Sequence, residues 1–226
     1  MKRVLLKILP FVLTNLLVVV FWKIWTETDN YAWNPQGKEL LFLDIALTSI
    51  FFYKVMFWLL VANLAVLTVI QLIRKKYKIA GIILLVTIVF YIFAGQYVSK
   101  KCAPFYYRVF LNQSVMEEYI ERPILEAGYY IGPILAKEII DKNMKYRLYA
   151  IGGLEKIKYK PATENLKQIL FDKTENEVFR ADAYETLHSF DTEETRKILN
   201  DFRSQATDTL DKGVIELGDY FIKSKR

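Results

Sequence analysis

The 226-residue sequence contains a single cysteine and a single histidine. Cys102 alone forms no internal disulfide, and no zinc cluster of cysteines is possible. His188 has no second imidazole or thiolate with which to share a metal, so we interpret it as an exposed helical residue. A catalytic triad would depend on this same histidine, and no G-x-S-x-G motif surrounds a serine. We therefore predict no enzyme activity, no cofactor and no catalytic or metal-binding residues.

Charged residues are also scarce before about residue 100, whereas they are mixed in throughout after about residue 113. Three apolar segments, at about 8–25, 55–73 and 79–98, meet the length of about 20 residues that a transmembrane helix needs. The first has no small-residue cleavage site after it, so we interpret it as an uncleaved anchor. We predict a transmembrane region over 1–101, a juxtamembrane linker over 102–113 and a soluble domain over 114–226.

Basic residues predict the orientation of these spans, because short loops rich in Lys and Arg stay on the cytoplasmic side. One side carries Lys2, Arg3, Lys7, Arg74, Lys75, Lys76 and Lys78. The loop between the first two spans is net acidic. We predict a multi-pass protein of the cytoplasmic membrane, inner or plasma, with the N-terminus inside and the C-terminal domain outside. Lys100, Lys101 and Arg108 oppose this orientation.

The positive net charge belongs to the membrane part. From residue 114 onward there are 18 Lys and Arg and 21 Asp and Glu, a net charge of 18 − 21 = −3. The preceding residues have 13 Lys and Arg and 4 Asp and Glu, a net charge of 13 − 4 = +9. A nucleic-acid-binding protein would carry a basic stripe on its soluble domain. We therefore predict the lipid bilayer and a protein as partners, and no nucleic acid.

The apolar pattern of the second span begins early, near Leu40. A continuous helix from there would have about 34 residues and a length of about 50 Å, against a hydrocarbon core about 30 Å thick. Either this helix projects from the membrane, or residues 40–54 form a separate surface helix. Asp44 and Lys54 lie in this segment and are candidate functional charges, since ionisable groups inside a bilayer are usually functional. The alternative is that both lie at the interface, with the Lys54 side chain extending to water.

The segment CAPFYYRVFL, which follows the third span, is rich in aromatic residues. We interpret it as a linker on the outer membrane surface. A competing interpretation is a docking site for a partner, because exposed aromatics beside an arginine are typical of interaction hot spots. The candidate residues are Phe105, Tyr106, Tyr107 and Arg108.

Two stretches in the second half share one pattern at a spacing of 33 residues: YRLYAIGGLEKI from Tyr146 and FRADAYETLHSF from Phe179. Each predicts a pair of short helices, since apolar residues recur at helical spacing on both sides of a turn. Asp191 and Glu194 suggest a capping box at the start of the last helix of the second pair. An earlier pair is visible in ILEAGYYIGPILAKEII, and the segment from Thr207 predicts a terminal helix.

These copies resemble HEAT-type repeats, of the kind grouped as HEAT-like repeats of the phycobilisome-lyase type. The residues that carry the resemblance are Arg147, Ala150, Leu154, Pro161 and Leu166 in one copy, and Arg180, Ala183, Leu187, Asp191 and Leu199 in the next. The earlier unit lacks a clearly placed arginine. The resemblance implies a structural role for these residues and a short α-solenoid that binds protein.

The sequence thus predicts an all-α protein, with three transmembrane helices followed by a short α-solenoid of about three HEAT-like helix pairs and a terminal capping helix. We expect a membrane-anchored interaction or scaffold protein. The alternative is an accessory subunit or small component of a membrane transport complex, in which Asp44 and Lys54 matter.

Overall fold

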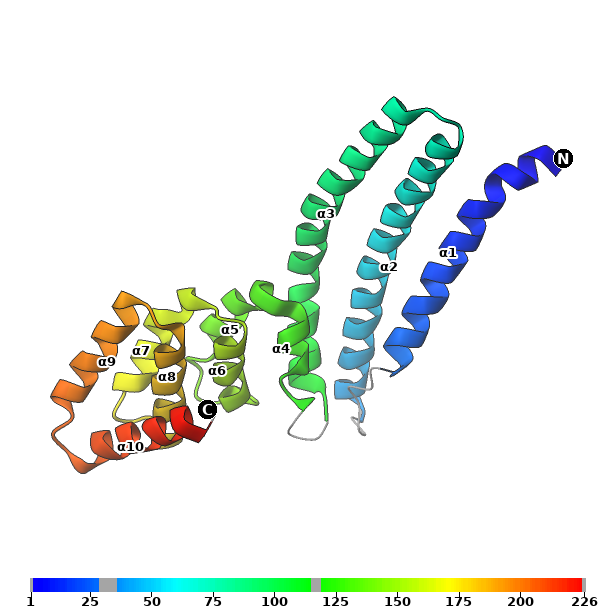
Figure 1. Ribbon diagram of the computed structural model, residues 1–226. Coiled ribbons are helices and arrows are strands. Elements are labelled where there is room, and N and C mark those ends of the chain that lie inside the picture. The colour runs from blue at the N-terminus through cyan, green and yellow to red at the C-terminus, as the bar shows by residue number, and fades with distance from the viewer. Residues whose placement is uncertain (1, 29–35, 115–118, 225–226) are drawn as a thin grey trace. The chain divides into compact units, whose positions relative to one another are not determined.

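The computed structural model describes residues 2–28, 36–114 and 119–224, and these contain helices and no β-strand (Figure 1). The predicted all-α class is confirmed for this part of the chain. The chain divides into two compact units, residues 1–115 and 116–226, which are described separately below. We call them the membrane unit and the helical unit.

Three long helices make up the membrane unit: α1 (Lys2–Thr28), α2 (Lys38–Ile73) and α3 (Tyr77–Asn112). All three are long and apolar enough to cross a membrane, which confirms the three predicted spans at the level of length and composition. The helix α2 packs against both α1 and α3. A turn at 74–76 joins α2 to α3, and Lys75 adopts a left-handed conformation there, with φ 59°.

The helix α2 is continuous over 36 residues, so residues 40–54 are not a separate surface helix. No glycine or proline, the two residues least favourable inside a helix, interrupts Lys38–Ile73. At 1.5 Å per residue its length is about 54 Å, well above a core of about 30 Å. Of the two sequence-based alternatives, the structure supports the continuous helix.

The predicted juxtamembrane linker over 102–113 is helical as far as Asn112, because α3 continues through it. Pro104 removes one backbone donor but does not end the helix. The physical reason is packing at helical spacing: the buried positions of this stretch are Cys102, Ala103, Tyr106, Val109 and Phe110. A stretch with such a buried face is a helix with packing partners and not a free linker.

Short helices make up the helical unit. In chain order they are α4 (Arg122–Ala127), η2 (Gly128–Ile131), α5 (Gly132–Glu138), α6 (Arg147–Lys156), η3 (Lys160–Ala162), α7 (Thr163–Phe171), α8 (Glu177–Phe190), α9 (Glu193–Gln205) and α10 (Thr209–Ser224). The helix α8 lies at the centre, since it packs against α6, α7, α9 and α10. The terminal helix predicted from Thr207 is present as α10.

The start of α9 corrects the predicted capping box by one residue. Thr192 is the N-cap, and its side chain and that of Thr195 each accept a hydrogen bond from the other residue's backbone N–H. Asp191 instead ends α8 in the left-handed conformation, with φ 48°. Because Asp191 is used to stop one helix, the capping role passes to the next residue.

Candidate functional site

Lys54 lies at the point where the three helices of the membrane unit are linked by side chains. Its half-buried Nζ donates a hydrogen bond to the hydroxyl oxygen of Tyr106 on α3. The same Nζ lies 5.0 Å from the centre of the Tyr106 ring and 5.7 Å from the centre of the Trp22 ring on α1. The ammonium is therefore held by a hydroxyl and two aromatic faces, an arrangement that stabilises a partly desolvated cation. Lys54 forms no ion pair with a carboxylate in the described part of the chain.

The position of Lys54 along α2 is informative. It precedes Arg74, which follows the last residue of α2, by 20 residues, or about 30 Å of helix. That length equals the thickness of a hydrocarbon core. A span that enters the core at Arg74 therefore reaches the opposite boundary at Lys54, which is where lysine side chains are tolerated.

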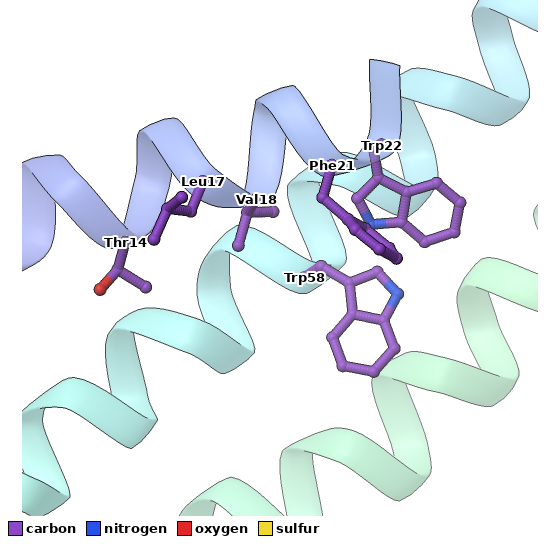
Figure 2. Close-up of a pocket in the computed structure, with 6 residues that line it drawn as sticks. All are labelled: Thr14, Leu17, Val18, Phe21, Trp22 and Trp58. Carbon is purple, nitrogen blue, oxygen red and sulfur yellow. The ribbon is translucent and has the colours of Figure 1, made fainter. Parts of the chain in front are cut away.

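An apolar groove of about 340 Å³ lies beside this cation, between α1 and α2 (Figure 2). Its lining residues are Thr14, Leu17, Val18, Phe21, Trp22 and Trp58. Figure 2 shows the two indole rings and Phe21 gathered at one end, with Thr14 at the other. Trp22 both lines the groove and faces Lys54, and Trp58 follows Lys54 by one helical turn. The groove and the cation are parts of one site.

Asp44, the other predicted membrane charge, is not part of this site. It is exposed and lies ten residues before Lys54 on α2, about 15 Å along the helix. Helical residues at this spacing do not meet. Asp44 therefore belongs to the end of α2 that extends about 45 Å from Arg74, beyond the thickness of the core.

The four predicted interaction residues at 105–108 do not form one surface. Tyr106 is only 2% exposed and faces Lys54. Phe105 contacts Tyr53 on α2, with ring centres 6.1 Å apart, and the exposed Arg108 lies 6.0 Å from the Phe105 ring. Because consecutive residues of a helix point in different directions, the predicted docking site is corrected: Tyr106 belongs to the buried face of α3.

Sequence reasoning missed a polar contact in the middle of the membrane unit. Asn63 on α2 donates a hydrogen bond of 2.8 Å from Nδ2 to Oδ1 of Asn15 on α1, and a second of 2.7 Å to the carbonyl of Leu59. A polar side chain within an apolar run was the available signal, since such residues usually find a partner on a neighbouring helix.

Of the ten residues that carry the repeat pattern, the two at the turns, Pro161 and Asp191, are exposed. The other eight are buried: Arg147, Ala150, Leu154, Leu166, Arg180, Ala183, Leu187 and Leu199. The two arginines make closely similar contacts. Arg147 donates from Nε to the carbonyl of Ile139 at 2.6 Å and pairs with Glu175 at 2.7 Å. Arg180 donates from Nε to the carbonyl of Leu170 at 2.9 Å and pairs with Asp211 at 2.5 Å.

Each arginine thus joins the end of the preceding helix to an acidic residue near the start of a later one. The repeat pattern contains the arginines but not their acidic partners, Glu175 and Asp211, which the sequence analysis did not single out. They follow their arginines by 28 and 31 residues, so no fixed spacing identifies them. What they share is a position next to a helix start: Glu175 lies just before α8, and Asp211 lies at the beginning of α10.

Exposed ion pairs connect the loops of the helical unit. Lys142 pairs with Asp172 at 2.7 Å, and Lys173 pairs with Asp208 at 2.6 Å. The hydrogen bond from Lys142, together with bonds from Thr174, lowers the pKa of Asp172 below its usual range. The bond from Lys173 likewise lowers the pKa of Asp208.

Tyr184 is the buried tyrosine that joins α8 to the C-terminal helices. Its hydroxyl accepts a hydrogen bond of 2.6 Å from Nε of Arg203 and donates one of 3.1 Å to Asp219. Burial raises the pKa of Tyr184 to about 12, although Arg203 opposes this effect. Within residues 2–28, 36–114 and 119–224, no group of three or more His, Cys, Asp or Glu side chains could hold a metal ion. His188 is exposed on α8.

Comparison of the chain with protein-family models, with curated proteins and with solved structures found no match. The resemblance to HEAT-like repeats therefore stays a prediction from the sequence pattern.

Proposed function

We propose that the protein is a membrane-anchored interaction protein of the cytoplasmic membrane. Three transmembrane helices anchor a short solenoid of HEAT-like helix pairs, and this solenoid binds another protein on the outer side. The observation that carries the proposal is the equivalence of the contacts of Arg147 and Arg180, which lie 33 residues apart.

A stack of repeats requires that residues at a fixed spacing, here the two arginines, make similar contacts, because each helix pair must present the same surface to the next. Arg147 connects its own helix pair to the start of α8 through Glu175. Arg180 connects the following helix pair to α10 through Asp211. The helices α6, α8 and α10 pack in sequence as one layer. The helices α7 and α9 belong to a second layer, joined by Phe171 and Phe202, whose ring centres are 5.2 Å apart.

In this proposal α10 is the capping helix of the stack. Its buried positions Asp211, Val214 and Gly218 recur at helical spacing and face α8. The Gly218 backbone lies against the ring of Tyr184, so closely that a Cβ would be 2.5 Å from a ring carbon. A terminal helix seated in this way covers the apolar side that α8 would otherwise expose.

The layer of α7 and α9 is the proposed binding surface, since stacked repeats use such continuous layers to bind partners. Its exposed residues include Gln168 on α7 and Lys197 and Asn200 on α9. They are polar, as expected of the rim of a transient protein interface.

The test is site-specific photocrosslinking of the full-length protein in its native membrane. A photoreactive residue at Gln168 or Lys197 should give one protein adduct of the same mass at both positions. The matched control is Leu17, which is 68% exposed on α1 and should label lipid. If neither helical-unit position gives a discrete protein adduct, the proposal is wrong.

The alternative, an accessory subunit of a transport complex, is favoured by one observation: Lys54 is a half-buried cation inside a candidate span. The same crosslinking experiment distinguishes the two functions. Protein adducts from outward-facing membrane positions such as Phe52 and Leu60, with none from α7 or α9, would support the alternative.

The proposed orientation has a separate test. Cys102 is only 1% exposed, so it is a poor target for a thiol reagent. An introduced cysteine at the exposed Ser204 of α9 gives an accessible thiol instead. Labelling of S204C by a membrane-impermeant reagent in intact cells is expected, and labelling only after lysis would reverse the orientation.

A further inference from the structure

We infer that the groove between α1 and α2, together with Lys54, is a binding site for an anionic phospholipid of the surrounding bilayer. One acyl chain occupies the groove, and the headgroup phosphate binds the ammonium of Lys54. The site rests on the membrane anchoring in the proposed function, and it requires nothing of the helical unit.

The groove suits an acyl chain. Of its six lining residues only Thr14 is polar, and none is ionisable. Both flanking helices are candidate spans, so the groove opens to the hydrocarbon of the membrane. Its volume of about 340 Å³ falls at the lower end of the range of small-molecule sites, about 300–1,000 Å³. A single chain fits these dimensions, whereas a partner helix is about 10 Å wide and needs a broader surface.

Lys54 suits the phosphate. An ammonium has three donors, and Tyr106 accepts one of them. Lys54 also lies over the faces of the Trp22 and Tyr106 rings, which neutralise no charge. In the described part of the chain no carboxylate pairs with Lys54, so an anion supplied by the bilayer would complete the site.

The two halves of the site lie at matching depths. Lys54 is about 30 Å of helix from Arg74, which places it at the boundary where headgroups begin. The groove extends from the Trp22 and Trp58 rings beside Lys54 toward Thr14, which lies about 12 Å nearer the middle of the span along α1 (Figure 2). A phospholipid has this same order, with phosphate at the boundary and chain below.

Tryptophan quenching by brominated lipid tests this inference on the full-length protein. Trp25 and Trp33 are replaced by Phe, so that the tryptophan fluorescence comes from Trp22 and Trp58 alone. The protein is reconstituted in phosphatidylcholine vesicles, and brominated phosphatidylglycerol or brominated phosphatidylcholine is titrated in. We expect about fivefold stronger apparent binding of the anionic lipid, the effect of one lysine near a membrane surface.

The charge is tested with three variants. K54Q should abolish the difference between the two lipids, and K54R should retain it. The matched control is K101Q, because Lys101 also lies over an aromatic ring, that of Tyr97 at 5.5 Å, at the same end of the membrane unit and away from the groove. Equal quenching by both lipids in the unchanged protein, or an equal loss in K101Q, would overturn the inference.

The groove is tested by filling it. V18F should weaken quenching by both lipids, whereas V12F, at an exposed position of α1 outside the groove, should leave it unchanged. Quenching by neither lipid, with a signal that changes with protein density in the vesicle, would show that a second copy fills the groove and would also overturn the inference.

Discussion

The two units of the protein place polar and apolar side chains in opposite ways. In the membrane unit many large apolar residues are exposed, such as Leu17 at 68% and Ile73 at 76%. In the helical unit the apolar residues lie inside, and even two arginines, Arg147 and Arg180, are buried. The difference is what we expect if the membrane unit lies in lipid and the helical unit in water, because the surrounding solvent decides which face a helix buries. Lipid is as apolar as a leucine side chain, so burial in the membrane unit gains little from the hydrophobic effect.

Polar contacts differ between the units in the same way. The helical unit joins its helices with buried arginine–carboxylate pairs and ends them with side-chain caps such as Asn176 and Thr192. In the described part of the membrane unit, the helices are linked by the amide–amide bond of Asn63 with Asn15 and by Lys54, which lies between two aromatic rings. The helical unit should therefore be sensitive to the loss of single polar groups, and the membrane unit much less so.

The largest expected effect is that of R180A. It leaves the carboxylate of Asp211, whose side chain is 5% exposed, with only the exposed Lys173 as a cation, at 3.3 Å. Because losing the buried partner of an ion pair typically costs about 3–5 kcal/mol, we expect a loss of up to this size. We expect the amide hydrogens of α8 and α10 to exchange much faster in the full-length protein, and those of α2 and α3 to stay protected. Hydrogen-exchange mass spectrometry of the reconstituted protein measures both.

The matched control is R196A. Arg196 also pairs with an aspartate, Asp191, but their side chains are 65% and 71% exposed, and such pairs contribute at most about 1 kcal/mol. Similar rates of amide-hydrogen exchange in α8 and α10 of R180A and R196A would show that the buried pair does not hold α10 in place. It would also remove the main support for a stack of repeats.

Next in size is a pair of glycine replacements in α10. A Cβ at Gly218 would lie 2.5 Å from the Tyr184 ring, so G218A should destabilise the helical unit by about 1–3 kcal/mol through overpacking. At Gly213 the nearest atom is 3.7 Å away, so G213A should stabilise α10 by up to about 1 kcal/mol through helix propensity. Urea unfolding in detergent, followed by circular dichroism, measures both, and effects of the same sign would contradict the packing of α10 on α8.

A smaller effect is expected in the membrane unit. N63L removes the bond to Asn15, and hydrogen bonds between transmembrane helices contribute about 0.6 kcal/mol on average. Steric-trap or detergent unfolding of the full-length protein should show a loss of this order, with the helical unit unaffected. A double-mutant cycle with N15L provides the control, because the second change should cost nothing once the first is made. A loss as large as that of R180A would contradict the contrast between the units.

Much of the fold was predictable from local sequence. Apolar length identified the three spans, and periodicity identified the helix pairs, because both depend on residues close together in the chain. The extents of α2 and α3 were not predictable in the same way. Cys102 to Phe110 contain a proline and many aromatics, and only their buried face in the folded protein explains why the helix continues.

The candidate site was predictable in part. Lys54 attracts notice as a charge in an apolar run, and that reasoning needs no structure. Trp22 and Tyr106 lie 32 and 52 residues away from it, and nothing in the sequence pattern connects them. Asp44 looked equivalent to Lys54 in the sequence, yet the continuous helix separates the two by about 15 Å. Contacts between distant residues depend on helix packing, which a single sequence does not state.

The smallest expected effect concerns acid and is confined to the helical unit. Lys142 and Thr174 hold the pKa of Asp172 below its usual value of about 3.9. A carboxyl whose pKa is lower in the folded state stabilises that state above its unfolded pKa, and this contribution is lost as the pH falls through the folded pKa. D172N should therefore unfold at a lower urea concentration than the unchanged protein at pH 6. The difference between their urea midpoints should become smaller below about pH 4. D201N is the control, since Asp201 is exposed and its carboxylate pairs with no described cation, so this change should alter the urea midpoint little. If the urea midpoints of D172N and the unchanged protein differ by the same amount from pH 6 to pH 3, the loop joining α5 and α6 is not held to Asp172 by charge.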